Sequence, residues 1–197
     1  MQIINVKQGT KEWFQARAGI PTASSFKLVM AKGQGKTRKT YMLKLAGEIL
    51  TGEPQEQFTN VHTERGNELE PEVLELYQIQ TDNDVEECGF IKTASAGYSP
   101  DGLIGDDGLI EIKTRLPHLQ IELLLADKVP SEHIAQIQGG LWVSGRDWCD
   151  FVSYCPGLPM FIKRVYRDED KISDISTAID KFNAELNVIV EKIGGMI

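Results

Sequence analysis

Apolar residues recur along the chain at two spacings, one typical of helices and the other typical of short strands. Helical spacing predicts helices over residues 10–17, 22–29, 41–50, 61–77, 117–125, 131–143 and 168–189. Short apolar runs between turn residues predict strands over 85–91, 98–105, 109–114, 148–154 and 160–166. Because no internal repeat or low-complexity linker interrupts this pattern, it indicates one α/β domain over residues 1–197, a mixed sheet flanked by helices.

The composition is that of a globular protein. With 197 residues, 41% hydrophobic and 25% charged, the chain is long enough to bury one sizeable core. No stretch of ~18 apolar residues and no signal-peptide pattern is present, so we expect a cytoplasmic protein without a membrane partner. Cys88, Cys149 and Cys155 are odd in number and lack the spacing of a zinc site, which favours buried free thiols.

The net charge of −8 argues against a general cationic nucleic-acid coat protein, because non-specific phosphate binding needs clustered Lys and Arg. It is compatible with a nuclease, since a metal site concentrates acidic groups while a local basic cluster can hold DNA. Residues 31–39 form such a cluster, and residues 33–39 are predicted to be a mobile loop. Their Gly35-Lys36-Thr37 lacks the upstream glycine and preceding strand of a P-loop, so we reject nucleotide binding there.

The strongest chemical signal lies in the hairpin predicted over residues 98–114. Strand alternation places Glu111 and Lys113 on one face, and the turn brings Asp101 toward that face. Two carboxylates repel unless a cation or a shared proton neutralises them, and their oxygens suit Mg²⁺. A neighbouring ammonium can position a water and stabilise charge on phosphorus, which indicates a phosphodiester-cleaving site. An isolated Asp…Glu-x-Lys would instead favour an ordinary surface hairpin with an exposed ion pair.

Two other regions carry weaker signals. Ser24 caps the helix over 22–29, and its hydroxyl and the backbone N–H groups there, with Arg17 nearby, form a potential phosphate cradle. Local reasoning alone favours a plain cap and a surface cation. Gln136 and Gln138 interrupt the apolar stripe of the helix over 131–143, where a glutamine can bond a phosphate, a water or a metal-site carboxylate. Each glutamine taken alone is better explained as helix surface.

The order of motifs carries more information than any one of them. Ser99-Pro100-Asp101-Gly102-Leu103 followed by Leu109-Ile110-Glu111-Ile112-Lys113 resembles the core of the PD-(D/E)XK nuclease superfamily, in the form found in the phage lambda exonuclease or YqaJ-like viral recombinase family. Trp13-x-x-x-Arg17, Thr22-Ala23-Ser24, Gly66…Glu70 and Ala135-Gln136-Ile137-Gln138…Leu141-Trp142-Val143 match in the family's order. This resemblance covers most of the chain, from Trp13 to about Trp142, weakens in the C-terminal helix and implies a restriction-endonuclease-like fold.

The resemblance also implies roles for individual residues. Those implied as metal ligands are Asp101, Glu111 and the carbonyl group of Ile112, with Glu70 as a further acidic group and Glu68 as its alternative. Lys113 is implied to lie next to the attacking water, and Gln136 to be the active-site glutamine. The residues implied to hold a terminal 5′-phosphate are Arg17, Ser24 and Ser99. Arg115 is the candidate for a downstream phosphate contact, because Thr114-Arg115-Leu116-Pro117 replaces the Cys-Pro that follows the lysine in many members.

The activity implied by the resemblance is a Mg²⁺-dependent 5′-to-3′ exonuclease, with Mn²⁺ as a substitute, that degrades one strand of linear double-stranded DNA and leaves 3′ overhangs. Family resemblance further implies a homotrimer that works with a phage single-strand annealing protein in a bacterial host. One alternative is a structure-specific or restriction-like endonuclease, against which the end-phosphate residues argue. The other is a DNA-binding module without activity, against which Asp101, Glu111 and Lys113 argue.

Overall fold

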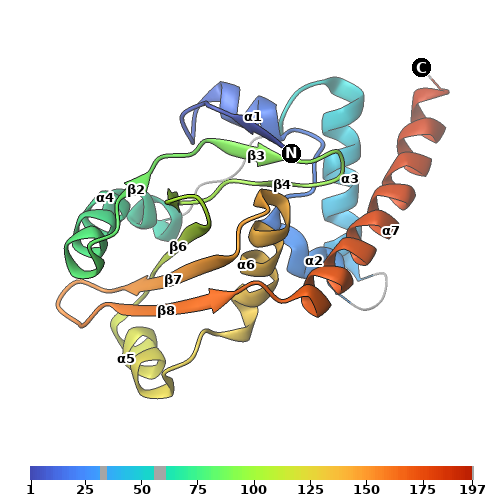
Figure 1. The fold of residues 1–197 in the computed structure, drawn as a ribbon. Coiled ribbons are helices and arrows are strands. Elements are labelled where there is room, and N and C mark those ends of the chain that lie inside the picture. The colour runs from blue at the N-terminus through green and yellow to red at the C-terminus, as the bar shows by residue number, and fades with distance from the viewer. Residues whose placement is uncertain (32–34, 56–60, 197) are drawn as a thin grey trace.

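The structure is a computed structural model that describes residues 1–31, 35–55 and 61–196 (Figure 1). Its helices are α1 (Lys11–Arg17), the short 3-10 helix η1 (Ala23–Ser25), α2 (Phe26–Met30), α3 (Lys36–Thr51), α4 (Val61–Thr81), α5 (Pro117–Ala126), α6 (Ser131–Ser144) and α7 (Glu169–Gly194). Most of these match the predicted helices. The exception is the start of α3, because Lys36–Lys39 are helical where a loop is predicted, and Gly33 and Gln34 of that loop lie outside the described residues.

The strands form two sheets. They are β1 (Gln2–Ile4), β2 (Val85–Glu86), β3 (Phe90–Lys92), β4 (Gly97–Tyr98), β5 (Gly102–Ile104), β6 (Gly108–Thr114), β7 (Trp148–Tyr154) and β8 (Phe161–Tyr166). The larger sheet has the order β2-β5-β6-β7-β8, and only its β6–β7 pair is parallel. The smaller sheet has the order β1-β3-β4 and is antiparallel. The predicted α/β fold, a mixed sheet flanked by helices, is confirmed.

Two predicted strands are each divided between the sheets. The strand predicted over 85–91 consists of β2 in the larger sheet and the start of β3 in the smaller one. The strand predicted over 98–105 likewise divides into the end of β4 and β5, with residues 99–101 between them. The prediction of single strands was wrong because an apolar run reports burial and not the sheet in which each residue pairs. The break after Tyr98 leaves Ser99 and Asp101 outside the regular ladders.

The five-stranded sheet is covered by helices on both faces. On one face, Val73 and Tyr77 of α4 pack against Ile110 and Ile112 of β6. On the other face, Leu109 joins the larger core that contains residues of α2, α3, α6 and α7. Alternation along β6 therefore directs Glu111 toward the α6 side of the sheet. In Figure 1, α7 runs beside α3 and beyond the edge of this sheet.

The parallel connection from β6 to β7 determines where α6 lies. Parallel neighbours need a crossover, which here consists of α5 and α6. Helix α6 packs against β3, β4 and η1, so it lies where the smaller sheet meets the larger one. Helix α6 can approach these neighbours closely because its Gly139 and Gly140 carry no side chain. A Cβ on Gly140 would lie 2.8 Å from the ring of Tyr98. None of the helices described is long and apolar enough to cross a membrane.

Candidate active site

Asp101 reaches β6 through a backbone hydrogen bond. Its Oδ2 accepts from the N–H of Ile112 at 2.6 Å. The antiparallel register that pairs Gly102 with Ile110 brings the two segments to this distance. A Cβ on Gly102 would lie 2.2 Å from Val85 of the neighbouring strand, so the Gly that follows Asp101 is required for this packing. The hairpin thus places Asp101 beside Glu111, as predicted.

Glu111 is the centre of the polar contacts. Its side chain is 1% exposed, and its Oε1 accepts from Lys113 Nζ and from Gln136 Nε2, each at 2.5 Å. Its Oε2 accepts from the hydroxyl of Tyr98 at 3.0 Å. The structure therefore brings together the predicted residues Glu111, Lys113 and Gln136. Tyr98 was missed by the sequence reasoning, and the only available signal was its position directly before the Ser-Pro-Asp motif.

Two carboxyl groups of this cluster, those of Asp101 and Glu70, are harder to ionise than usual. Burial raises the pKa of Asp101 well above its usual value, and the charge of Glu111 acts in the same direction. Burial also raises the pKa of Glu70, with Glu111 again contributing. Burial acts to lower the pKa of Lys113, but Glu111 and Asp101 outweigh it, so the net shift is upward and Lys113 is a cation. If Asp101, Glu70 and Glu111 were all ionised, their three negative charges would face the single positive charge of Lys113, and a bound divalent cation would offset the excess.

The donor set of Asp101, Glu111 and main-chain oxygens such as that of Ile112 fits Mg²⁺, which is commonly held by one or two carboxylates and several waters. Across residues 1–31, 35–55 and 61–196, no three His, Cys, Asp or Glu side chains are placed to hold a metal ion. Glu70 interacts electrostatically with Glu111 and Lys113, and its role as a metal ligand stays a prediction. Between the two candidates on α4, Glu68 is exposed, whereas Glu70 is half-buried and interacts with Glu111.

Arg17 and Ser99 form a second polar centre next to the carboxylates. Arg17 Nη1 donates to Ser99 Oγ at 2.7 Å, and Trp13 Nε1 donates to the same oxygen at 2.9 Å. The guanidinium lies 4.1 Å from the centre of the Trp13 ring. Burial lowers the pKa of Arg17 to about 10, so it remains charged at neutral pH. Arg17 forms no ion pair within 4.0 Å among the described residues, although the charge of Glu48 acts on it, and a partly buried guanidinium of this kind suits an anionic ligand.

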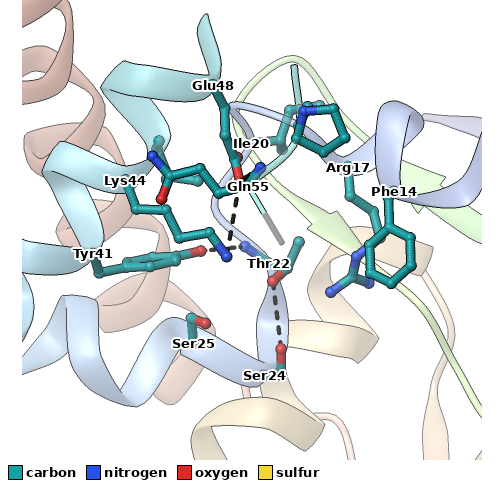
Figure 2. Close-up of a pocket in the computed structure, with 13 residues that line it drawn as sticks. Phe14, Arg17, Ile20, Thr22, Ser24, Ser25, Tyr41, Lys44, Glu48 and Gln55 are labelled. Atoms are coloured by element: carbon teal, nitrogen blue, oxygen red, sulfur yellow. Dashed lines mark hydrogen bonds and ion pairs between the residues drawn. The ribbon is translucent and has the colours of Figure 1, made fainter. Parts of the chain in front are cut away.

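Ser24 and Arg17 line one cavity of about 180 Å³ between α1, η1 and α3 (Figure 2). Ser24 is exposed, and its Oγ lies 3.4 Å from Oγ1 of Thr22. The structure therefore places Arg17 in contact with Ser99 and on a shared cavity with Ser24. Since Arg17 contacts Ser99 and Asp101 follows two residues later, one short segment links the Arg17 centre to the carboxylates.

Arg115 and Lys113 line a second cavity of about 350 Å³, together with His133 of α6. The Nη2 of Arg115 lies 2.8 Å from Nε2 of His133, whose pKa falls to about 4 because of burial and the charges of Lys113 and Arg115. His133 is therefore a neutral acceptor at this contact. The buried Nε of Arg115 has no hydrogen-bond partner among the described residues, so this donor is unsatisfied in the structure.

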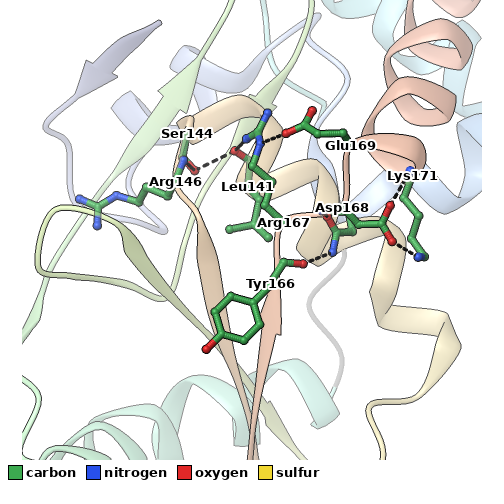
Figure 3. A network of polar contacts seen from close by, with 9 residues as sticks. Leu141, Ser144, Arg146, Tyr166, Arg167, Asp168, Glu169 and Lys171 are labelled. Carbon is green, nitrogen blue, oxygen red and sulfur yellow. Dashed lines mark hydrogen bonds and ion pairs between the residues drawn. The ribbon is translucent and has the colours of Figure 1, made fainter.

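A network at the end of α6 holds this helix in place (Figure 3). The Nε2 of Gln138 donates to the carbonyl of Tyr166 at 2.8 Å, and its Oε1 accepts from the N–H of Asp168 at 2.9 Å. Arg167 donates to the carbonyl of Leu141 at 2.7 Å. Gln138 is thus buried and ties α6 to the end of β8, which distinguishes it from Gln136 in the carboxylate cluster. The idea that Gln138 is plain helix surface was wrong.

Comparison with known proteins assigns the chain to a family. Residues 12–147 match the YqaJ-like viral recombinase domain. No curated protein sequence matches the chain. Among solved structures, an alkaline exonuclease (LHK-Exo) from Laribacter hongkongensis is 41% identical with a TM-score of 0.87, over 95% of this chain and 97% of that one. The structure of LHK-Exo in complex with dAMP also has 41% identity and a TM-score of 0.87, over 93% and 96%.

A phage related exonuclease from Haemophilus somnus 129PT is 16% identical, with a TM-score of 0.66 over 88% of this chain and 96% of that one, and this similarity extends to the fold alone. The family match spans both the Arg17 centre and the carboxylate hairpin, and the two LHK-Exo structures extend the likeness to nearly the whole chain. The chain belongs to the YqaJ-like viral recombinase family.

Proposed function

We propose that the chain is a Mg²⁺-dependent exonuclease that degrades one strand of linear double-stranded DNA from a 5′-phosphorylated end in the 5′-to-3′ direction. The observation that carries this proposal is the short segment from Ser99 to Asp101. At one end of this segment, Ser99 contacts Arg17, a cation suited to a terminal phosphate. At its other end, Asp101 belongs to the cluster of carboxylates and Lys113 that is suited to hydrolysis. Membership of the family and 41% identity to an alkaline exonuclease support the nuclease assignment.

The reaction would be hydrolysis of the bond between the scissile phosphorus and the 3′ oxygen of the terminal nucleotide. Asp101, Glu111 and the carbonyl of Ile112 would hold Mg²⁺, with Mn²⁺ as a substitute, and the bound ion supplies Lewis-acid stabilisation of the phosphate. Lys113 holds a positive charge where negative charge develops on the phosphate oxygens. Gln136 and Tyr98 keep Glu111 in position by donating to its two oxygens.

Each turnover would regenerate the substrate. The released nucleotide keeps its 5′-phosphate and gains a 3′ hydroxyl, while the shortened strand begins with the phosphate that was attacked. Arg17, Ser24 and Ser99 can therefore meet the same group in every cycle. The relative LHK-Exo has been captured with dAMP, a nucleoside monophosphate of the kind such a reaction releases.

Further parts of the proposal rest on the family resemblance. We infer a homotrimer around the DNA, a phage single-strand annealing protein as its partner in recombination, and a location in the cytoplasm of a bacterial host. Arg115 would contact a phosphate downstream of the scissile bond, because it lines the same cavity as Lys113. The acidic chain would thus hold DNA through local cations and not through its net charge.

The proposal is tested by replacing Lys113 with methionine, which keeps most of the aliphatic stem and removes the charge. Lys113→Met should lower the rate of Mg²⁺-dependent cleavage of a linear duplex by roughly 10²-fold or more while changing duplex affinity little, because its charge acts on the reacting phosphate. Lys163→Met is the matched control, since Lys163 pairs with Asp127 at the surface of the same sheet. Cleavage that persists in EDTA, or equal losses of rate and affinity, would contradict this account.

A further inference from the structure

Lys44 of α3 lines the same cavity as Arg17, opposite it (Figure 2). Neither the resemblance nor the proposed mechanism gives this lysine a role. The cavity also contains the hydroxyl groups of Thr22, Ser24, Ser25 and Tyr41, so its wall consists largely of cationic and neutral donors. A site of this kind suits a small ligand with several anionic oxygens.

The ammonium of Lys44 has no hydrogen-bond acceptor in the part of the chain that the structure describes. Glu48 Oε1 is the carboxylate oxygen that pairs with it, at 3.8 Å, which is beyond hydrogen-bond distance. The two oxygens of Glu48 already accept from backbone N–H groups, that of Gly19 at 2.8 Å and that of Gln55 at 3.2 Å. The donors of Lys44 are therefore available to a ligand, although 73% of its side-chain surface is covered, since it is 27% exposed.

The charged side chains that line the cavity have a net positive charge only when Lys44 is included. Arg17 contributes one positive charge and the buried Glu48 one negative charge, and each interacts with the other. These two alone sum to zero. With Lys44 the sum is +1, which favours an anion in partly buried surroundings where charges are weakly screened.

The hydroxyl of Tyr41 provides a further donor. Its oxygen accepts from the N–H of Thr22 at 3.2 Å, so the hydroxyl proton remains free to point into the cavity. Arg17, Lys44 and Tyr41 then surround the space from α1 and α3. A phosphate monoester offers three terminal oxygens to such donors, whereas a backbone diester offers two and a hydroxyl end offers none.

We propose that Lys44 is a second cation of the 5′-phosphate pocket and a specificity-determining residue, selecting a dianionic phosphate monoester at the DNA end. This inference rests on the proposed function, because it assigns the terminal phosphate to the cavity beside Arg17. It adds that the pocket uses two cations from two helices, α1 and α3, so that end recognition depends on how these helices are held together.

The test measures binding and not cleavage. Internally labelled duplexes with a 5′-phosphate or a 5′-hydroxyl end are titrated by fluorescence anisotropy in EDTA, with wild type, Lys44→Gln, Lys44→Arg, Arg17→Ala and the control Lys11→Gln. Lys11 is an exposed lysine on α1, the helix of Arg17, that does not line the cavity. Lys44→Gln should reduce the preference for the phosphate end by about tenfold, the size of one charge-assisted contact. Lys44→Arg and Lys11→Gln should keep most of it.

The outcomes separate the two proposals. A wild-type preference that Arg17→Ala removes and Lys44→Gln leaves intact would overturn the role of Lys44 while keeping the proposed end recognition. An equal loss of affinity for both ends in Lys44→Gln would make it a general DNA contact and would also overturn the inference. If wild type shows no preference for the phosphate end, the end-recognition part of the proposed function fails and this inference fails with it.

Discussion

When no cation is bound, the buried carboxyl group of Asp101 lowers the stability of the folded protein at high pH. Its pKa in the folded protein lies well above the usual value because burial and Glu111 disfavour its charge. A group whose folded-state pKa is raised stabilises the fold below its unfolded pKa, and this contribution is lost as the pH rises through the folded pKa. Without a cation, Asp101 therefore lowers the free energy of unfolding progressively as the pH rises above its unfolded pKa.

Asp101→Asn should relieve this cost, because an amide oxygen can still accept from the N–H of Ile112 and carries no charge. We expect the melting temperature in EDTA at pH 8 to rise by a few degrees, since 1 kcal/mol corresponds to ~2–4 °C for a domain of this size. The gain should shrink toward pH 4. Mg²⁺ should raise the melting temperature of wild type but not of the variant. If Mg²⁺ did not change the melting temperature of wild type at pH 8, this result would argue against a metal at these carboxylates.

At the residue scale, the sequence alone predicted which side chains of a fixed motif lie close together. The spacing of Asp101, Glu111 and Lys113 follows from a hairpin and from strand alternation, so their proximity was predictable. Tyr98 and Lys44 were not, because each meets its partners through tertiary contacts from another sheet or helix. The choice between Glu68 and Glu70 likewise needed the face of α4 that lies against β6.

At the element scale, the position of α6 determines whether Glu111 is held correctly. Gln136 reaches Glu111 from α6, and Tyr98 reaches it from β4, while Gly140 is where these two elements touch. A methyl group on Gly140 would lie 2.8 Å from atoms of the Tyr98 ring, which is too close for a real contact. The ring or the helix would have to move, and both movements affect the contacts of Glu111.

Gly140→Ala should therefore lower stability by ~1–3 kcal/mol, the usual cost of overpacking a core, and should reduce cleavage in the fraction that remains folded. Gly194→Ala is the matched control, because a Cβ there lies 3.7 Å from Leu50, an ordinary contact, near the end of α7. It should be neutral or slightly stabilising, since Ala favours helices over Gly. Urea unfolding and initial cleavage rates of both variants give the comparison. If Gly140→Ala matched wild type in both, the close packing of α6 on β4 would not matter to the site.

Strand boundaries show the limit of sequence reasoning about elements. The apolar runs over 85–91 and 98–105 were recognised as extended, but each contributes to two sheets. Periodicity detects that a segment is buried and extended, whereas its pairing partner depends on contacts distant in sequence. The start of α3 at Lys36 was missed because charged residues and Gly35 suggested a loop, and the helix there is stabilised by tertiary contacts such as the ion pair of Arg38 with Glu185 of α7.

At the scale of the whole molecule, the architecture separates two tasks. The five-stranded sheet and α6 hold the carboxylates, whereas the smaller sheet, α1 and α3 hold the cation centre and its cavity. Residues 99–101 join the two parts, so in the reaction that we propose one segment would hold both the phosphate at Arg17 and the phosphate beside Lys113. This arrangement explains why the activity that we propose acts at an end and not within a closed duplex.

The most direct measurement uses linear and closed circular duplex DNA under the same conditions. The linear duplex carries one label at a 5′-phosphorylated end and another at the 3′ end of the same strand, and products are resolved over time with Mg²⁺. The account predicts early release of the 5′ label as a mononucleotide, late loss of the 3′ label, intact circular DNA and no reaction in EDTA. Early loss of the 3′ label would contradict the polarity, and rapid nicking of the circular duplex would show an endonuclease instead.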